Sequence, residues 1–228
     1  MDRHHPTKRH RPFAAGDLSL KIGYLAIPCL FASSLVIGLT LSLSFVLLLF
    51  IYFTLATTYS FYFKQFALVD VILLAGLYTL RIYAGGTAIS VVPSEWLLAF
   101  SMFTFLSLAL LKRFSELRLI IQTNKDSVMG RGYGASDLAY VANVGLICGC
   151  MAVLVLALYI SSKEVTVLYE QPNLLWLICA MALYWITPAW LLANRGRLHE
   201  DPLLFALKDR KSYGIAVATG IIMILASR

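Results

Sequence analysis

The sequence predicts an all-α integral membrane protein, built as one transmembrane domain over residues 1–228. Apolar residues make up 60% of the 228 residues and charged residues only 14%, far from the averages of soluble domains. The apolar residues occur in long runs, and each run approaches the ~20 residues that a helix needs to cross a bilayer. No internal repeat or linker marks off a second domain.

We predict seven helical spans, one for each apolar run. In chain order they are Ile22–Leu39, Phe45–Phe63, Leu68–Ile89, Trp96–Leu111, Leu138–Ile160, Leu174–Ala193 and Tyr213–Ala226. Polar residues separate the runs, and Trp96 and Trp176 stand where an aromatic belt is expected at the outer membrane boundary. The last run is the shortest.

The positive charges predict the orientation of these spans. Most of the 19 lysines and arginines fall in Arg3–Lys21, at Lys64, in Lys112–Arg131 and in Arg195–Lys211. These segments alternate along the chain with connections that carry only Lys163. The positive-inside rule therefore places the basic loops in the cytoplasm, as expected for a multi-pass protein of the cell inner membrane. The same rule explains the net charge of +7, and no basic stripe interleaved with aromatic residues indicates nucleic acid.

Two charges lie within the third run, where a charged side chain usually faces a cavity or a partner. Asp70 and Arg81 are 11 residues apart. This spacing is close to three helical turns, so both are expected on one helix face. About 16 Å of helix axis separates them, so each needs its own partner. The alternative for both is a structural role in holding helices together.

The loop expected after the fourth run carries further candidates. It begins Lys112-Arg113-Phe114-Ser115-Glu116. A Lys-Arg pair at the end of a span is commonly an anchor, and so is Lys64 after the second run. Glu116 is more informative, because a carboxylate beside two cations can hold a divalent metal or orient a phosphate clamp. The later segment Gly130-Arg131-Gly132-Tyr133-Gly134 does not match a phosphate-binding loop, and we interpret it as flexible.

These residue types point to phosphate chemistry at a membrane. Arginine and lysine suit a diphosphate or a phosphate ester. Carboxylates suit Mg²⁺, which is held by few carboxylates together with substrate phosphates. A cavity among apolar helices suits a long isoprenoid chain. The combination predicts an enzyme that displaces a diphosphate at the membrane surface, with the metal stabilising the leaving group.

Several short motifs resemble the UbiA family of membrane prenyltransferases. The basic N-terminal stretch is similar to the end of the family's first N-x-x-x-D-x-x-x-D motif and the residues after it. The segment from Asp70 to Gly86 is similar to one branch of the family, which includes decaprenyl-phosphate phosphoribosyltransferase. The matching residues are Asp2, His5-Pro6, Lys8-Arg9, Arg11-Pro12-Phe13-Ala14-Ala15-Gly16, Tyr59-Ser60 with Lys64, and Lys112-Arg113 with Glu116-Leu117.

The resemblance implies a UbiA-like bundle of nine transmembrane helices with a site that faces the cytoplasm. Seven of the nine expected helices are predicted here. The asparagine and the first aspartate of the motif would precede Met1. The resemblance therefore implies an N-terminal truncation, with an upstream domain or a companion chain supplying the missing helices.

The resemblance also implies roles for individual residues. The catalytic residues would be Asp2, Asp70 and Glu116, and Asp2 and Glu116 would hold the Mg²⁺ cofactor. The substrate-binding residues would be Lys8, Arg11, Lys64, Arg81, Lys112 and Arg113.

The implied function is a transferase that uses a polyprenyl lipid substrate and a diphosphate-containing co-substrate. The transferred group is either a prenyl chain from a polyprenyl diphosphate or a phosphoribosyl group passed to a polyprenyl phosphate, and the sequence does not separate the two. One alternative is an inactive pseudoenzyme or an accessory membrane subunit, and another is a small transporter. The 228 residues alone are expected to show little transferase activity.

Overall fold

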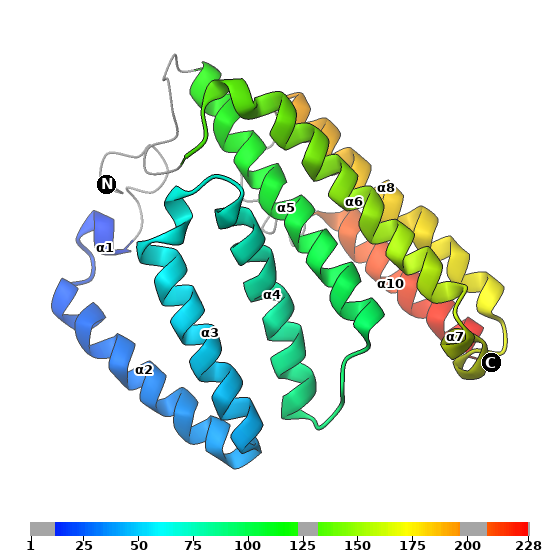
Figure 1. Cartoon of the computed structure of the whole chain (residues 1–228), viewed down its shortest axis with the longest axis horizontal. Coiled ribbons are helices and arrows are strands. Elements are labelled where there is room, and N and C mark those ends of the chain that lie inside the picture. The colour runs from blue at the N-terminus through cyan, green and yellow to red at the C-terminus, as the bar shows by residue number, and fades with distance from the viewer. Residues whose placement is uncertain (1–11, 123–131, 197–208, 228) are drawn as a thin grey trace.

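The computed structural model describes residues 12–122, 132–196 and 209–227. The described part of the chain is helical throughout, with short connections (Figure 1). The long helices are α2 (Leu20–Leu41), α3 (Leu43–Phe61), α4 (Val69–Ala88), α5 (Glu95–Gln122), α6 (Leu138–Ile160), α8 (Trp176–Asn194) and α10 (Arg210–Ala226). The short ones are α1 (Pro12–Ala15), η3 (Phe63–Gln65), η4 (Ala135–Asp137), α7 (Lys163–Leu168) and η5 (Pro172–Leu175).

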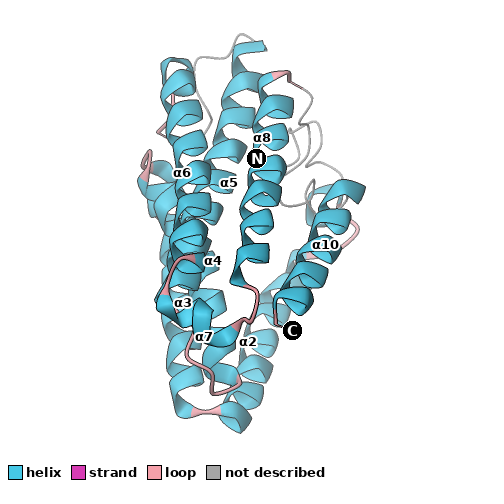
Figure 2. Cartoon of the chain, turned by 90° about the vertical axis from the view of Figure 1, so that its right-hand side faces the viewer, coloured by secondary structure: helices cyan, strands magenta, loops and turns pink. Residues whose placement is uncertain are grey.

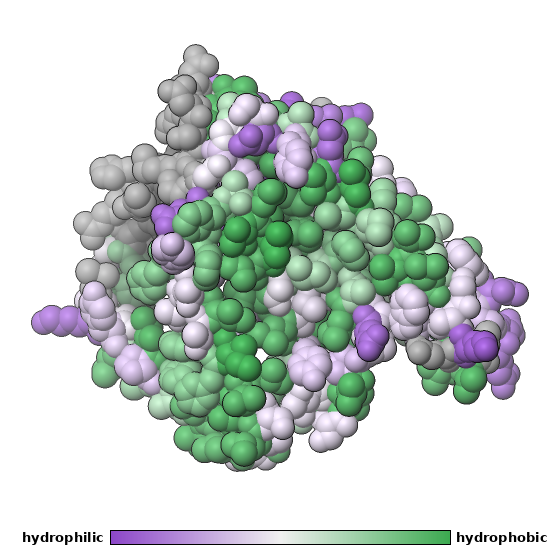
Figure 3. Space-filling model, viewed as in Figure 1, coloured by the Kyte–Doolittle hydropathy of each residue, from purple (hydrophilic) through white to green (hydrophobic). Residues whose placement is uncertain are grey.

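Each predicted span corresponds to one long helix, so the prediction of an all-α membrane fold is confirmed. Six of the long helices in the described residues have the length and the apolar composition to cross a membrane. The seventh, α10, has only 17 residues, fewer than the ~20 that a straight span needs. Apolar residues cover most of the face of the molecule in Figure 3, as expected for a surface against lipid.

The boundary predicted at Leu111 is wrong. Helix α5 continues to Gln122, so Lys112 and Glu116 lie on a helix and not in a loop. The extra turns are rich in good helix formers such as Leu, Arg and Glu. They also bury Phe114 and Leu117 against the core, which keeps the helical face packed beyond the apolar run.

Neighbouring helices run in alternating directions along the chain (Figure 1). A single residue, Ser42, joins α2 to α3, and its hydroxyl accepts a hydrogen bond from the Phe45 N–H at 3.1 Å. Helices α2 to α6 lie side by side in chain order (Figure 1), whereas α10 leans away from the other helices in Figure 2. The α3–α4 and α5–α6 connections therefore share one end of the bundle, which we call the Arg113 end.

The core lies where α5, α6 and α8 meet. In the apolar 18-residue stretches of α5 and α6, 39% of the residues are buried, against 6% in those of α2 and α3. Gly145 and Gly149 on α6 form a small-xxx-small pattern, which lets helices approach closely. A Cβ on Gly145 would lie 2.3 Å from the Trp190 ring, and one on Gly149 would lie 2.8 Å from Ile186. These contacts fix how α8 packs on α6.

The orientation of the bundle gives a first testable prediction. We expect the Arg113 end to face the cytoplasm, because Lys64, Lys112 and Arg195 lie there among the described residues. In a chain whose four cysteines are replaced by alanine, Ser94→Cys should react with an impermeant maleimide in intact cells. Gln65→Cys should react only after permeabilisation. Both positions are exposed, on the α4–α5 and α3–α4 connections respectively. Labelling of Gln65→Cys from outside would show that the bundle has the opposite orientation.

Candidate functional site

A buried ion pair joins α4 to α5 at the Arg113 end. Arg113 Nε donates to Asp70 Oδ2 at 2.7 Å, and the two side chains are 2% and 0% exposed. Asp70 lies in the first turn of α4, where the helix dipole favours a negative charge. Two charges removed from water in this way are tolerated because they pair with good geometry. The sequence prediction that Asp70 needs its own partner is confirmed.

The same guanidinium also holds Glu116. Arg113 Nη1 donates to Glu116 Oε2 at 2.5 Å, across one helical turn of α5. The Glu116 side chain is 29% exposed, so it is the member of this trio that reaches the surface. Two carboxylates thus share one guanidinium, and Glu116 is the carboxylate that meets the outside.

Two tyrosines complete the cluster. The Tyr133 hydroxyl donates to Asp70 Oδ1 at 2.7 Å and accepts the Leu68 N–H at 2.8 Å. Tyr59, near the end of α3, interacts electrostatically with Arg113, Asp70 and Glu116. Tyr133 is only 3% exposed, so the interpretation of its segment as a flexible loop is wrong for this residue. The residue is buried in the core, and the only signal of this in the sequence is a single aromatic residue between two glycines.

The other predicted site residues lie in different places. Lys64 is exposed on η3 and Lys112 is half-buried beside Arg113, both at the Arg113 end. Asp2, Lys8 and Arg11 lie outside the described residues.

Arg81 is not part of the cluster. It lies about 16 Å along α4 from Asp70. Its Nε donates to the Tyr52 hydroxyl at 2.9 Å, and its guanidinium lies over the rings of Tyr52 and Tyr78 at 5.0 and 5.2 Å. Arginine on an aromatic face is a stable arrangement for a cation at membrane depth. The prediction that Arg81 finds a separate partner is confirmed.

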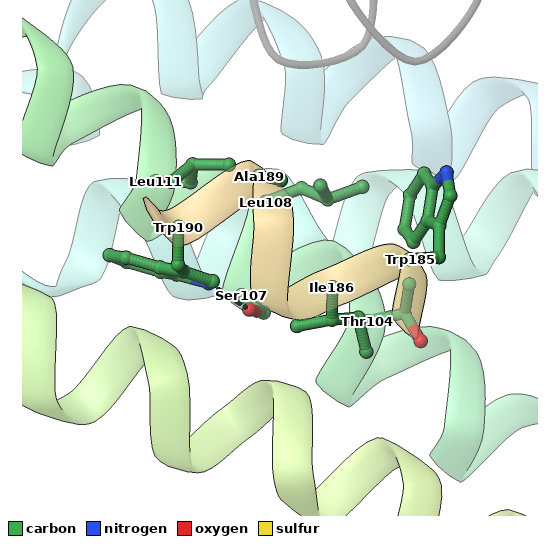
Figure 4. A pocket seen from close by; sticks show the side chains of 8 residues that line it. All are labelled: Thr104, Ser107, Leu108, Leu111, Trp185, Ile186, Ala189 and Trp190. Carbon is green, nitrogen blue, oxygen red and sulfur yellow. Dashed lines mark hydrogen bonds between the residues drawn. The ribbon is translucent and has the colours of Figure 1, made fainter. Parts of the chain in front are cut away.

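An apolar pocket lies between α5 and α8, deeper in the bundle than the charged cluster. Its lining residues are Thr104, Ser107, Leu108, Leu111, Trp185, Ile186, Ala189 and Trp190 (Figure 4). The Ser107 hydroxyl donates to the Gly145 carbonyl and accepts from Trp190 Nε1, and the Thr104 hydroxyl donates to the Phe100 carbonyl. The polar groups are thus engaged in packing, and the lining carries no charge.

The described residues offer few ligands to a metal. They contain no group of three His, Cys, Asp or Glu side chains placed to bind an ion. Mg²⁺ is commonly held by one or two carboxylates together with substrate phosphates. Glu116 can serve as one such carboxylate because it is partly exposed. Asp70 fits this role poorly, since it is fully buried against Arg113 and Tyr133.

The architecture defines a class of protein: a multi-pass helical membrane protein with a charged cluster at one end of its bundle. Comparison with known proteins gives the family. The chain belongs to the UbiA prenyltransferase family, whose sequence model matches residues 1–208. The family resemblance seen in the short motifs is thereby confirmed.

Individual relatives give further detail. The chain is 36% identical to the uncharacterized protein y4nM of Sinorhizobium fredii, over 97% of this chain and 44% of that protein. It is 32% identical to the nodulation protein NoeC of Azorhizobium caulinodans, over 100% of this chain and 75% of NoeC. It is 34% identical to the decaprenyl-phosphate phosphoribosyltransferase of Mycolicibacterium smegmatis, over 54% of this chain and 38% of that enzyme. The chain thus spans less than half the length of y4nM.

Proposed function

We propose that this protein is a membrane transferase that acts at the Arg113 end of the bundle. It either passes a group from a diphosphate-containing donor to a polyprenyl substrate, or passes the prenyl chain of a polyprenyl diphosphate to an acceptor. The family and the named phosphoribosyltransferase relative support a transferase of the prenyltransferase type. One observation carries the choice of site: Arg113 is buried between Asp70 and Glu116, and only Glu116 of the three is appreciably exposed.

The burial of these groups suggests a division of roles. Glu116 is the catalytic residue, because it is the carboxylate of the cluster that reaches the surface. Arg113 and Asp70 act through Glu116 by fixing its position. Lys64 and Lys112 lie at the same end and suit the phosphates of the donor, since an ammonium is a compact partner for a phosphate oxygen.

Mg²⁺ would be held by Glu116 and the donor phosphates, with Asp2 as a further candidate ligand, and would neutralise the charge of the departing diphosphate. In the phosphoribosyl version, the bond between ribose C1 and the diphosphate oxygen breaks. A bond from C1 to an oxygen of the polyprenyl phosphate forms, and inorganic diphosphate leaves. In the prenyl version, the prenyl C1 takes the place of the ribose carbon and the acceptor displaces the diphosphate. The relatives named as phosphoribosyltransferases make the first version the one to assay first.

A matched pair of variants on one helix tests this function. We expect Glu116→Gln to lower the rate of transfer by at least about 100-fold, because a catalytic carboxylate would be lost. Glu95→Gln should leave the rate unchanged, since Glu95 is exposed at the opposite end of α5. The measurement is Mg²⁺-dependent diphosphate release by the full chain in detergent, with phosphoribosyl diphosphate plus polyprenyl phosphate in one arm and a polyprenyl diphosphate plus acceptor in the other.

Each outcome has a clear meaning. Equal rates for the Glu116→Gln and Glu95→Gln variants would show that Glu116 is not a catalytic residue. Little activity is expected of the 228 residues alone, so even slow turnover would support the proposal. Turnover of neither donor by the unmodified chain would contradict the transferase proposal and favour an accessory subunit.

A further inference from the structure

The turn between α3 and α4 has a strained backbone at Leu68. This residue has φ +65° and ψ −42°, and the Val69 N–H donates to the Ala67 carbonyl at 2.8 Å. Leu68 is therefore the centre of a γ-turn with positive φ, a rare and strained form. Leucine seldom adopts positive φ. The turn directly precedes Asp70, so the direction of the Asp70 carboxylate depends on the turn keeping this shape.

Tyr133 holds both the turn and the carboxylate. Its hydroxyl accepts the N–H of Leu68 and donates to Oδ1 of Asp70. Burial and the hydrogen bond to Asp70 both raise the pKa of Tyr133. The hydroxyl therefore keeps its proton at neutral pH and remains the donor in this contact. The hydroxyl oxygen of Tyr133 thus contacts both the strained backbone at Leu68 and the buried carboxylate of Asp70.

The backbone of Gly132, next to Tyr133, packs closely against the turn between α3 and α4. A Cβ on Gly132 would lie 2.8 Å from the Gln65 carbonyl oxygen and 3.0 Å from the Ala67 nitrogen. Both neighbours are backbone atoms, which cannot move aside cheaply. On Gly134 the nearest atom to an added Cβ lies 3.6 Å away. The tight fit is thus specific to position 132, and it fixes where the Tyr133 ring enters the core.

We propose that Tyr133 is a positioning residue for the transfer reaction. Its hydroxyl fixes Asp70, Asp70 fixes Arg113, and Arg113 fixes Glu116. The contacts in this relay measure 2.7, 2.7 and 2.5 Å. Tyr133 itself is buried, so it acts on the geometry of Glu116 without touching the substrate. This inference rests on the proposed function, because it concerns the same site.

The first test needs no activity. The Nε–H group of Arg113 is observed by NMR in the full chain, labelled with ¹⁵N-arginine and kept in detergent micelles, and Arg113→Lys identifies its signal. We expect Tyr133→Phe to shift this signal and to speed its exchange with water, because Asp70 loses a donor that orients it. An Arg113 signal that is the same in Tyr133→Phe as in the unmodified chain would overturn the proposal.

The second test is kinetic. Loss of an outer-shell partner commonly costs about 10- to 100-fold in metal affinity or activity. We expect Tyr133→Phe to raise the Mg²⁺ concentration for half-maximal rate, or to lower kcat/KM, within that range. In a Glu116→Asp background, where the carboxylate is already displaced, Tyr133→Phe should cost less than about twofold further. Full additivity of the two changes would indicate a merely structural role and contradict the proposal.

Four further variants separate positioning from general damage. Tyr140→Phe removes an exposed hydroxyl on α6, and Ser107→Ala removes buried hydrogen bonds away from the cluster. Neither should change the Mg²⁺ dependence. Gly132→Ala should reproduce the Tyr133→Phe effect by displacing the ring, whereas Gly134→Ala should not. If the unmodified chain turns over neither donor, the proposed function fails. The Arg113 signal then decides alone: no change in Tyr133→Phe and Gly132→Ala would overturn the relay.

Discussion

Arg113→Ala is expected to destabilise the protein by about 3–5 kcal/mol, the usual cost of removing one partner of a buried ion pair. Asp70 would lose the cation that it faces in a site with no access to water, and Glu116 would lose a partner on the same helix. The loss is measured as a shift in the midpoint of unfolding by SDS in mixed micelles, with the helix content followed by circular dichroism.

Two further variants show whether the unpaired charge is the cause. Adding Asp70→Asn to the Arg113→Ala chain should restore part of the lost stability, because no uncompensated charge then remains buried. Arg118→Ala on the same helix removes only an exposed hydrogen bond to Asn194 and should cost less than about 0.5 kcal/mol. Equal losses in the Arg113→Ala and Arg118→Ala chains would contradict this account.

Gly145→Ala is expected to be the most damaging single-methyl change in the core. The new Cβ would lie 2.3 Å from two carbons of the Trp190 ring and 3.0 Å from Leu110 Cβ. Overpacking of this kind typically costs about 1–3 kcal/mol. The large indole is itself tied to Ser107 by a hydrogen bond, so it cannot simply turn away. The measurement is the same SDS unfolding midpoint.

Gly76→Ala on α4 is the matched control for this prediction. An added Cβ there meets nothing within 4 Å. Because glycine weakens a helix relative to alanine by about 0.5–1 kcal/mol, this variant should be neutral or slightly stabilised. In the Gly145→Ala chain, Trp190→Leu should make the methyl group less costly than it is beside tryptophan. A Gly145→Ala chain as stable as Gly76→Ala would refute the close approach of α6 and α8.

The sequence was most informative about helices and least informative about their contacts. Long apolar runs set the spans because the bilayer fixes the length of a helix. Hydropathy does not predict the extension of α5, since it falls at Lys112 although the buried face continues through Leu117. The pattern at Gly145 and Gly149 acquires meaning only when Trp190 on another helix is placed against it.

The candidate site shows the same limit. Asp70 is indicated by the cost of a charge within an apolar run, and Glu116 is indicated as a carboxylate beside two cations. Arg113 is a candidate through the family resemblance. Their pairing could not be predicted, since 43 residues separate Asp70 from Arg113. Tyr133 was missed because its two partners lie 63 and 65 residues away, and nothing local distinguishes a buried loop tyrosine from an exposed one.

The uneven burial of the helices has a consequence for how this sequence can vary. In α2 and α3, only 6% of the residues in the apolar 18-residue stretch are buried. Most side chains there need only be soluble in lipid. Leu, Ile, Val and Phe should therefore exchange freely there in a saturation mutagenesis library. In α5 and α6, where 39% is buried, shape as well as hydrophobicity is selected. Related chains should accordingly diverge fastest along α2 and keep their identities longest where α6 meets α5.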